Sequence, residues 1–504
     1  MNRQVLNAWC TGLFIFSTQL LGYGTLTQND FFPVYSTQWP YSFMNENFKA
    51  VEKQMTDRRL NERVKITLTS FAQKASKTRD TEKNETYLGD RVGPWNFIGL
   101  TYGTVPAGQT FTTSLQNAIN NATYQDGQPI TYTNYSDTNQ NLGFLSVPLK
   151  YQKIGMRFGA EARLLNDFVF FVRGGFAQIK QTAGINAADA AATATVTSTT
   201  NGLGPVVPIG PFINRELRQN YTAGTPPVAN GRVVQLQDYY GTSTPGGGIT
   251  TVEPDIAMVE TNLIQKYQTI FNELGVNIGD FNETGPEDIC AGAVWRHNFF
   301  INVNDAQEYA PFIMTPFFGI TGSIAIGKEQ DPNKAFSLPF GNNGHHALSI
   351  NTGFSMDFYE TVEISWQAGA THFFKRDVPG LFVPTDDLQQ GIYPFRTNVT
   401  VDPGKTWYFN FGMNAYHFID KLSFFGQYLF LTHSQDTYTL LKADSAFKPG
   451  RLSQDSIWKV QAMNLGLHYD FSPHLSFGAL WQTPLMQRAA YKTNTIALSM
   501  TLVF

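Results

Sequence analysis

The feature that most constrains this chain is an alternation of apolar and polar residues with a period of two. In the run 154–164, Ile154, Met156 and Phe158 fall on one face, while Arg157 and Glu161 fall on the other. Successive side chains of a β-strand point to opposite faces, so this pattern predicts a strand whose two faces meet different surroundings. The apolar face suits lipid and the polar face suits water.

Such runs return in pairs that are joined by very short connections. Four pairs are joined by residues 165–167, 359–361, 419–421 and 472–474. Each run is about ten residues long, which is the length that a tilted strand needs to cross the hydrocarbon core of a bilayer. Longer polar segments separate the pairs, at residues 327–345, 376–405, 434–457 and 483–492. Short turns at one end and long loops at the other are typical of outer-membrane barrels.

The alternating runs predict an all-β fold, an antiparallel transmembrane β-barrel of about 12 strands with short periplasmic turns and long extracellular loops. An even number of strands lets the first and the last pair antiparallel, which leaves no open edge in lipid. Residues 97–102 could add strands, so 14 is the alternative. Pro311 and Pro316 each lack a ladder donor, so the fifth strand would be bulged or would begin later than residue 312. The twelve strands are expected at 64–71, 154–164, 168–176, 290–301, 312–326, 348–358, 362–370, 407–418, 422–432, 461–471, 475–481 and 495–504.

Composition excludes several other classes of protein. Aromatic residues make up 14% and charged residues 15% of the chain, and the mean hydropathy is −0.22. Beyond the first two dozen residues no uninterrupted apolar stretch of roughly 18 residues occurs, which excludes a bundle of membrane helices. The formal net charge is −4, and the sequence contains no cluster of basic residues that would bind phosphate groups, so no nucleic acid is expected as a partner. After the leader only Cys290 remains, which excludes an internal disulfide and a cysteine metal site; no cofactor is expected.

The N-terminal segment predicts export. Arg3 precedes an apolar run, and Gly22-Tyr23-Gly24 offers small residues for cleavage, so residues 1–24 are interpreted as a signal peptide that is removed. Residues 25–61 would stay in the periplasm or plug the barrel. The barrel would occupy residues 62–504, with long loops at about 74–143 and 181–288. Helical spacing of apolar residues at 256–270 predicts an amphipathic helix within the second loop.

The last strand carries a pattern of alternate apolar residues that ends on an aromatic residue at the C-terminus. It resembles the signal by which the assembly machinery recognises Gram-negative, porin-like outer-membrane β-barrels, without pointing to a specific family. The resemblance implies location in the cell outer membrane, with that machinery and outer-membrane lipids as partners. Outward aromatic residues, among them Trp407, Trp481 and Tyr416, would then lie at the lipid headgroups. The signal would consist of Ile496, Leu498, Met500, Leu502 and Phe504.

If the apolar faces meet lipid, the polar faces line the interior. Clustered arginines there could favour anions by the logic of charged rings in pores. Passive diffusion of small solutes is therefore the leading hypothesis. The alternative is a plugged barrel that serves as a structural or surface-adhesion protein, since side chains can fill a small barrel. The candidates for pore-lining residues are Lys153, Arg157, Glu161, Arg163, Arg173, Arg296, Glu363, Asn410 and Asn414.

A catalytic function is not expected. Among the eight histidines, none recurs with a serine and an acidic residue at a spacing that indicates a hydrolase triad. His345 and His346 are adjacent, so in extended backbone they would point to opposite faces and could not easily share a metal ion. They are interpreted as solvated loop histidines. Neither the permeant solute nor the oligomeric state follows from the sequence.

Overall fold

A computed structural model describes residues 64–80, 83–90, 95–96, 100, 103–120, 144–145, 149–165, 167–183, 228–229, 232–233, 267–277, 279–301, 311–331, 333–334, 337–359, 361–387, 389, 391–419, 421–472 and 474–504. The expected signal peptide, the segment 25–61 and most of the two long loops lie outside these residues. Of the segment 97–102, which could have added strands, only residue 100 is described.

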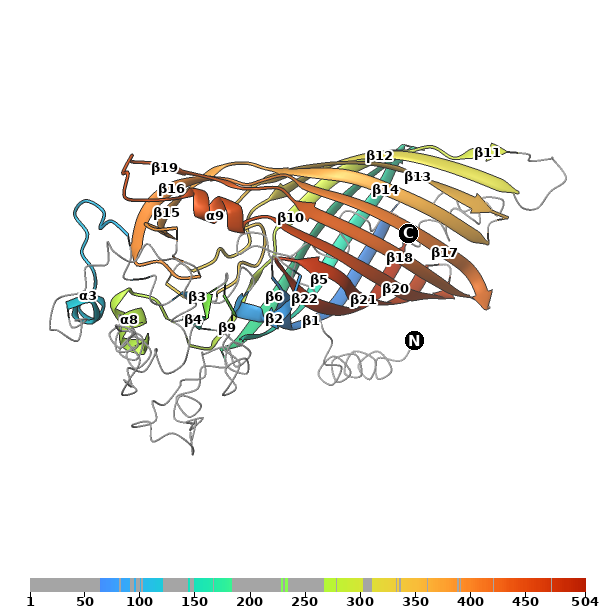
Figure 1. The fold of residues 1–504 in the computed structure, drawn as a ribbon. Coiled ribbons are helices and arrows are strands. Elements are labelled where there is room, and N and C mark those ends of the chain that lie inside the picture. The colour runs from blue at the N-terminus through green and yellow to red at the C-terminus, as the bar shows by residue number, and fades with distance from the viewer. Residues whose placement is uncertain are drawn as a thin grey trace, which may run out of the picture.

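Twelve antiparallel strands form a closed barrel, as the alternation predicted (Figure 1). Sequential neighbours pair with one another, and the pairings of β1 with β22 and of β6 with β10 complete the ring. The strands are β1 (Val64–Arg79), β5 (Leu149–Leu165), β6 (Phe168–Ala183), β10 (Ile289–Arg296), β12 (Phe312–Ile324), β13 (Ala347–Phe358), β14 (Val362–Phe373), β17 (Thr406–Ile419), β18 (Leu422–His433), β20 (Trp458–Ser472), β21 (Leu475–Arg488) and β22 (Ala490–Val503).

One wall position is filled by an interrupted strand. β9 (Phe281–Pro286) precedes β10 and pairs with the far half of β6, while β11 (Phe299–Ile301) follows β10 and pairs with β12. The interruption between β10 and β11 explains how β12 accommodates Pro316. The backbone N and O of a strand residue point toward the same neighbour. The carbonyl oxygen of Pro316 accepts a hydrogen bond from the amide of His297. The side of Pro316 that lacks an N–H group therefore faces the interruption between β10 and β11. The strand begins directly after Pro311 and needs no bulge at Pro316.

The two ends of the barrel differ, as the alternation of short and long connections predicted. At the end that we call the turn end, β13–β14, β17–β18 and β20–β21 are joined by connections of two or three residues, and Val64 and Phe504 exchange backbone hydrogen bonds of 3.2 and 2.8 Å. The expected loop at 483–492 is wrong. β21 continues to Arg488, and Ala489 alone, with φ of 48°, turns the chain into β22. Polar residues and Pro484 in this segment favoured a loop, but the pairing of β21 with β20 skips Leu485, so the strand continues past the proline with a local irregularity.

The opposite end, which we call the loop end, carries the remaining secondary structure (Figure 1). The expected loops at 376–405 and 434–457 contribute a small three-stranded sheet. This sheet packs against Ala347 and Phe373, which lie at the loop ends of β13 and β14. The elements of this sheet and its surroundings are β15 (Arg376–Val383), β16 (Phe395–Asp402), β19 (Thr437–Leu440) and the helix α9 (Gly450–Asp455).

The long loops at 74–143 and 181–288 are shorter than expected, because β1 reaches Arg79, β6 reaches Ala183 and β9 begins at Phe281. The expected helix at 256–270 overlaps the described helix α8 only from residue 267 onward. The other elements described in these loops are β2 (Glu85–Tyr87), η2 (Leu88–Asp90), β3 (Trp95–Asn96), α3 (Thr113–Asn120), β4 (Phe144–Leu145), β7 (Val228–Ala229), β8 (Arg232–Val233) and α8 (Tyr267–Glu273).

The outer surface of the barrel is apolar. Large hydrophobic side chains on alternate strand positions are exposed, and a soluble protein rarely leaves so many uncovered in one band. No helix among the described residues is long and apolar enough to cross a bilayer. The exposed apolar band and the closed ring of strands together define a transmembrane β-barrel. The exposed residues include Phe158, Phe176, Phe318, Ile350, Phe409, Phe411, Met413 and Leu467.

Candidate functional site: the barrel interior

Inward and outward positions differ sharply in their exposure. Phe411 on β17 is 48% exposed, whereas its neighbour Asn410 is 0% exposed. The same contrast holds around the wall for most residues that the sequence placed inside. Arg163 and Arg296 are half-buried. Whether these residues line a path for solutes stays a prediction. Those that are buried are Lys153, Arg157, Glu161, Arg173, Glu363, Asn410 and Asn414.

The first charged cluster inside the barrel joins β5 to the short segment between β9 and β10. The Glu287 carboxylate lies 2.6 Å from Lys153 Nζ and accepts hydrogen bonds from Arg157 Nε at 2.6 Å and Nη2 at 2.9 Å. The Arg157 guanidinium also lies over the ring of Phe71, 3.9 Å from its centroid. Glu287 fell within an expected loop, so the sequence did not identify it. The acidic pair Glu287-Asp288 directly before the run at 290 was the available signal.

A second charged cluster lies further toward the turn end. Glu161 on β5 is 2.5 Å from Arg173 Nη2 on β6 and 3.6 Å from Lys65 Nζ on β1. As in the first cluster, one carboxylate serves two cations. Arg157 and Arg173, which the sequence suggested as sources of anion preference, are therefore both bound to carboxylates. Each of the two clusters keeps one net positive charge among its three side chains.

Neutral polar side chains occupy inward positions on seven neighbouring strands, in register except between β17 and β18, where Asn410 pairs with Leu429 and Gln427 with Gly412. Their pairing positions follow the hydrogen-bonding direction of the sheet, which runs obliquely around a barrel because its strands are tilted. Gln367 lies opposite Asn410, Gln427 opposite Asn464, and Asn464 opposite Gln482. Thr495 lies opposite both Gln482 and Gln73. We call this set the carboxamide row, and its members are Gln73, Gln367, Asn410, Gln427, Asn464, Gln482 and Thr495.

Hydrogen bonds connect parts of the carboxamide row and leave other atoms without a partner. Asn464 Nδ2 donates to Gln427 Oε1 at 3.0 Å, and Gln73 Nε2 donates to Thr495 Oγ1 at 3.5 Å. Neither amide atom of Asn410 has a hydrogen-bond partner among the residues that the structure describes. The same holds for both amide atoms of Asn351, which lies diagonally beside the row on β13. Buried amide groups normally have partners, which leaves these four atoms as donors and acceptors for water or a solute.

A third polar group connects β14 and β17 near the turn end. Asn414 Nδ2 donates to Glu363 Oε2 at 3.2 Å, and the hydroxyl of Tyr416 donates to the same oxygen atom. Tyr416 was expected among the outward aromatic residues, and that expectation is wrong. Tyr416 has the same parity as the inward residues Asn410 and Asn414, so its ring lies on the inner side, where its hydroxyl donates a hydrogen bond to Glu363. Trp407, Trp481 and Tyr469 are exposed.

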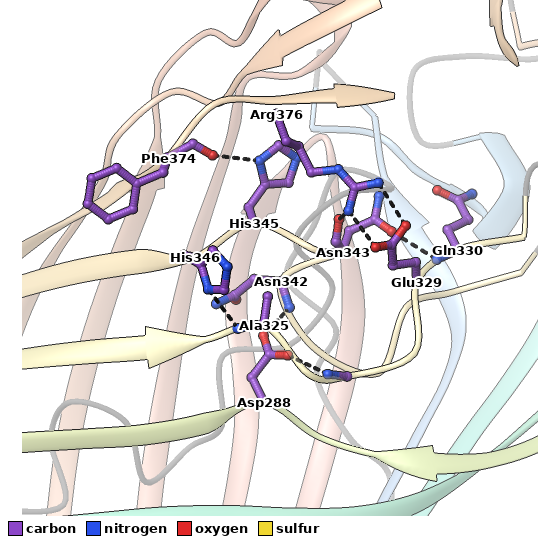
Figure 2. Close-up of polar contacts among 11 residues, drawn as sticks. Asp288, Ala325, Glu329, Gln330, Asn342, Asn343, His345, His346, Phe374 and Arg376 are labelled. Atoms are coloured by element: carbon purple, nitrogen blue, oxygen red, sulfur yellow. Dashed lines mark hydrogen bonds and ion pairs between the residues drawn. The ribbon is translucent and has the colours of Figure 1, made fainter. Parts of the chain in front are cut away.

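The connection between β12 and β13, residues 325–346, folds against the interior at the loop end. The carbonyl oxygen of Phe340, a buried residue, lies 3.3 Å from Lys153 Nζ. Asp288 accepts hydrogen bonds from the backbone amides of Gly327 at 2.8 Å and Asn342 at 2.5 Å (Figure 2). These contacts tie the connection to the segment that also carries Glu287, and they leave it little freedom to move away from the barrel.

A second set of contacts holds the same connection to the start of β15. Arg376 Nη1 and Nη2 lie 2.6 and 2.7 Å from the two carboxylate oxygens of Glu329, and Nη1 also donates to the carbonyl of Asn343 at 3.0 Å (Figure 2). Bidentate pairing of this kind fixes geometry as well as charge. The Arg376 guanidinium therefore joins both halves of the connection to the three-stranded sheet.

His345 belongs to this connection and is buried, so its interpretation as a solvated histidine is wrong. Its Nδ1 donates to the carbonyl oxygen of Phe374 at 2.9 Å (Figure 2). Burial, which the hydrogen bond to Phe374 only partly offsets, lowers the pKa of His345 to about 4. The ring is therefore neutral at pH 7. His346, by contrast, is exposed, and its Nδ1 accepts from the amide of Ala325 at 3.2 Å.

A hydroxyl, a histidine and a carboxylate meet at the loop ends of β17 and β18. Thr406 Oγ1 lies 2.8 Å from His433 Nδ1, and His433 Nε2 lies 2.8 Å from Asp436 Oδ1. The sequence analysis missed this group because it looked for a serine as the hydroxyl partner of a histidine, whereas the hydroxyl here belongs to Thr406 on a neighbouring strand. All three side chains are buried, and the Trp458 ring stacks on His433 with centroids 5.4 Å apart. Asp436 also accepts from the amide of Gly404 at 2.7 Å, so the group connects two loops to the barrel.

Metal binding has no evident place among these residues. Within the described part of the chain, no group of three or more histidine, cysteine, aspartate or glutamate side chains could hold an ion. Cys290 is buried on β10, where its thiol lies 3.5 Å from Ser323 Oγ.

No family model and no curated protein matches the chain. Among solved structures, the chain is similar to an outer membrane channel from Pseudomonas putida F1, with 6% identity, a TM-score of 0.41, and coverage of 88% of this chain and 96% of that one. It is also similar to a FadL homologue from Pseudomonas aeruginosa, at 9% identity and a TM-score of 0.28, with 95% and 98% covered. A third is the transport unit of the autotransporter AIDA-I from Escherichia coli, at 8% identity and a TM-score of 0.29, with 94% and 100% covered.

Proposed function

We propose that this protein is an exported outer-membrane channel through which small hydrophilic solutes diffuse passively, with the turn end in the periplasm and the loop end outside the cell. The observation that carries the proposal is the set of buried amide groups on Asn351 and Asn410, which have no partner within the described part of the chain. A barrel whose interior is filled only with its own side chains would pair such groups or replace them with apolar residues. Unpaired amides favour an interior that takes up water and solutes.

The composition of the interior supports this proposal. Below the apolar cluster at the loop end, the inward positions of β13, β14, β17 and β22 are mainly asparagine, glutamine, serine and threonine. A wall of this kind can exchange hydrogen bonds with passing water and solutes. The proposed location follows from the apolar outer band, the resemblance of the last strand to the assembly signal and the expected signal peptide.

A plugged barrel with a structural or surface-binding function is the second candidate, and specific contacts favour it. The connection 325–346 folds in far enough for Phe340 to contact Lys153 on β5. In addition, an apolar cluster on the inner face at the loop end includes Tyr408, Leu431 and Trp458. Both features narrow the interior. If they close it permanently, the long loops would be the functional surface.

Efflux from liposomes distinguishes these functions. The mature chain would be refolded into lipid vesicles that contain labelled solutes of increasing size, and folding would be verified by the heat-dependent shift of its band in gel electrophoresis. We expect small hydrophilic solutes to leave the vesicles while large ones stay. Retention of every solute by vesicles that contain folded protein would contradict the channel and favour the plugged barrel.

A further inference from the structure

The carboxamide row is distinct within the interior because its side chains are buried and, except for Thr495, all carry a carboxamide group. Its seven residues lie on β14, β17, β18, β20, β21, β22 and β1, and none of them is ionisable. We propose that this row, together with Asn351, binds small uncharged solutes that carry hydroxyl groups, such as polyols and simple sugars, and selects them over charged solutes. This inference rests on the proposed channel function and names the solute class that the channel prefers.

The unpartnered atoms define the chemistry of the expected ligand. Asn351 and Asn410 each offer one amide nitrogen as a donor and one oxygen as an acceptor. Gln73 Oε1 and Asn464 Oδ1 add acceptors, and Gln427 Nε2 adds a donor. A hydroxyl group donates one hydrogen bond and accepts others, so a polyol can satisfy donors and acceptors along the row at the same time. A ligand that can only accept or only donate would leave half of these atoms unsatisfied.

The carboxamide row should bind charged solutes much more weakly than polyols. Transfer of an ion from water into a closely packed interior costs several kcal/mol unless an opposite charge or dedicated ligands replace its hydration. The row supplies no opposite charge. The cation opposite Gln73 on the neighbouring strand is Lys153, and Glu287 already holds it at 2.6 Å. Apolar solutes are disfavoured for another reason, because they would displace water from amide groups and leave those groups without any partner.

The arrangement of the row also suits movement of a bound solute. Side chains at paired positions on neighbouring antiparallel strands have Cβ atoms roughly 5 Å apart. A solute with several hydroxyl groups can therefore form a hydrogen bond with the next member of the row before it releases the previous one. The step from Asn410 to Gln427 is longer, roughly 7–8 Å, because these two residues lie diagonally on β17 and β18. Gly319 leaves space beside Asn351, because a Cβ atom at residue 319 would lie 2.5 Å from Asn351 Oδ1. The Asn351 side chain extends over this glycine.

The test compares two small solutes in liposome swelling: xylitol, which is uncharged and rich in hydroxyl groups, and glycine betaine, which is smaller and zwitterionic. For the wild-type chain we expect faster swelling in xylitol. Asn351→Leu and Asn410→Leu should each reduce the ratio of the two rates about fivefold, which corresponds to about 1 kcal/mol for one lost hydrogen-bonding group. The ratio cancels any general narrowing of the passage.

Two control variants separate recognition from folding. Asn410→Gln keeps a carboxamide and should keep the preference for xylitol, whereas Met413→Leu on the outer face of the same strand should change neither rate. An unchanged ratio in both leucine variants, or equal wild-type rates in the two solutes, would overturn the inference while the channel function stands. Absence of swelling in every solute would overturn the channel function itself, and this inference with it.

Discussion

The carboxylate of Glu287 accepts two hydrogen bonds from the guanidinium of Arg157, at 2.6 Å from Nε and 2.9 Å from Nη2. Both side chains are buried, and they belong to segments 130 residues apart in the sequence. The pair therefore fixes the interrupted strand β9–β10 against β5. Lys153 also pairs with this carboxylate, so loss of the Glu287 charge would leave two cations buried together.

We expect Glu287→Gln to lower the free energy of unfolding by roughly 3–5 kcal/mol, because removal of one partner leaves buried charge without compensation. Unfolding of the barrel by guanidinium chloride in lipid vesicles measures this change. Glu329→Gln is the matched control. Its carboxylate binds Arg376 but is 51% exposed, so its loss should cost less than about 1 kcal/mol. Equal effects of the two substitutions would contradict the structural importance of Glu287.

Phe411→Arg tests the assignment of the outer face. The side chain of Phe411 is 48% exposed on β17, in the band that we assign to lipid. An arginine there should lower the free energy of unfolding in lipid by about 2–4 kcal/mol if the position lies near the bilayer midplane. Phe411→Leu, which keeps an apolar side chain, should have a much smaller effect. Comparable stability of the arginine and leucine variants would show that this face does not meet lipid.

The connection 325–346 should lose stability as the pH falls from about 6.5 toward 4. The folded-state pKa of His345 lies at about 4, below the ordinary value of 6.5, because the ring is buried. His345 therefore binds a proton at a higher pH when the connection is released than when it is folded. Lowering the pH from about 6.5 to 4 thus favours release of the connection. Hydrogen exchange of the backbone amides at pH 7 and pH 5 measures the effect.

His345→Gln is the control for this pH dependence, since glutamine does not titrate and can still donate to the carbonyl of Phe374. The Arg376 guanidinium holds the pKa of Glu329 below its usual value of 4.5, so the Glu329–Arg376 pair weakens only at lower pH than the window used. If the His345→Gln variant kept the wild-type difference between pH 7 and pH 5, another group would be responsible.

Phe504 tests the resemblance of the last strand to an assembly signal. Its side chain is 61% exposed, while its backbone hydrogen-bonds to Val64. Phe504→Ala should therefore change the free energy of unfolding by less than about 1 kcal/mol. We expect it to slow insertion by the barrel assembly machinery several-fold, measured as the rate at which the heat-modifiable folded form appears in cells. A normal insertion rate would argue against a recognition function of the terminal residue.

The wall of the barrel was predictable because one physical constraint repeats in every strand. Each strand separates lipid from the interior, so its sequence must alternate, and the run 154–164 shows this as clearly as the structure does. The short turns followed from the same runs. The one-residue turn at Ala489 was missed because Thr483, Pro484 and the polar residues that follow interrupt the alternation and favour a loop, whereas the strand continues through an irregular pairing at Leu485.

The contents of the interior were predictable only as a list of polar residues. Parity placed Arg157 and Asn410 inside, but it could not show that Arg157 is bound by Glu287, because that partner comes from a loop whose path the sequence does not determine. The same limit applies to His345 and to the group of Thr406, His433 and Asp436. These contacts depend on how distant loops pack, and no local pattern records that packing.

Single-channel recording in planar bilayers tests the central claim most directly. The purified, refolded mature chain would be added at low concentration, and current would be followed in potassium chloride at fixed voltage. The account predicts stepwise increases in conductance, each from one inserted barrel, because an interior that admits hydrophilic solutes also lets water and ions pass, even where ions are not the preferred solutes. Insertion of folded protein without any current steps would contradict a channel and would favour a barrel that its own connections permanently close.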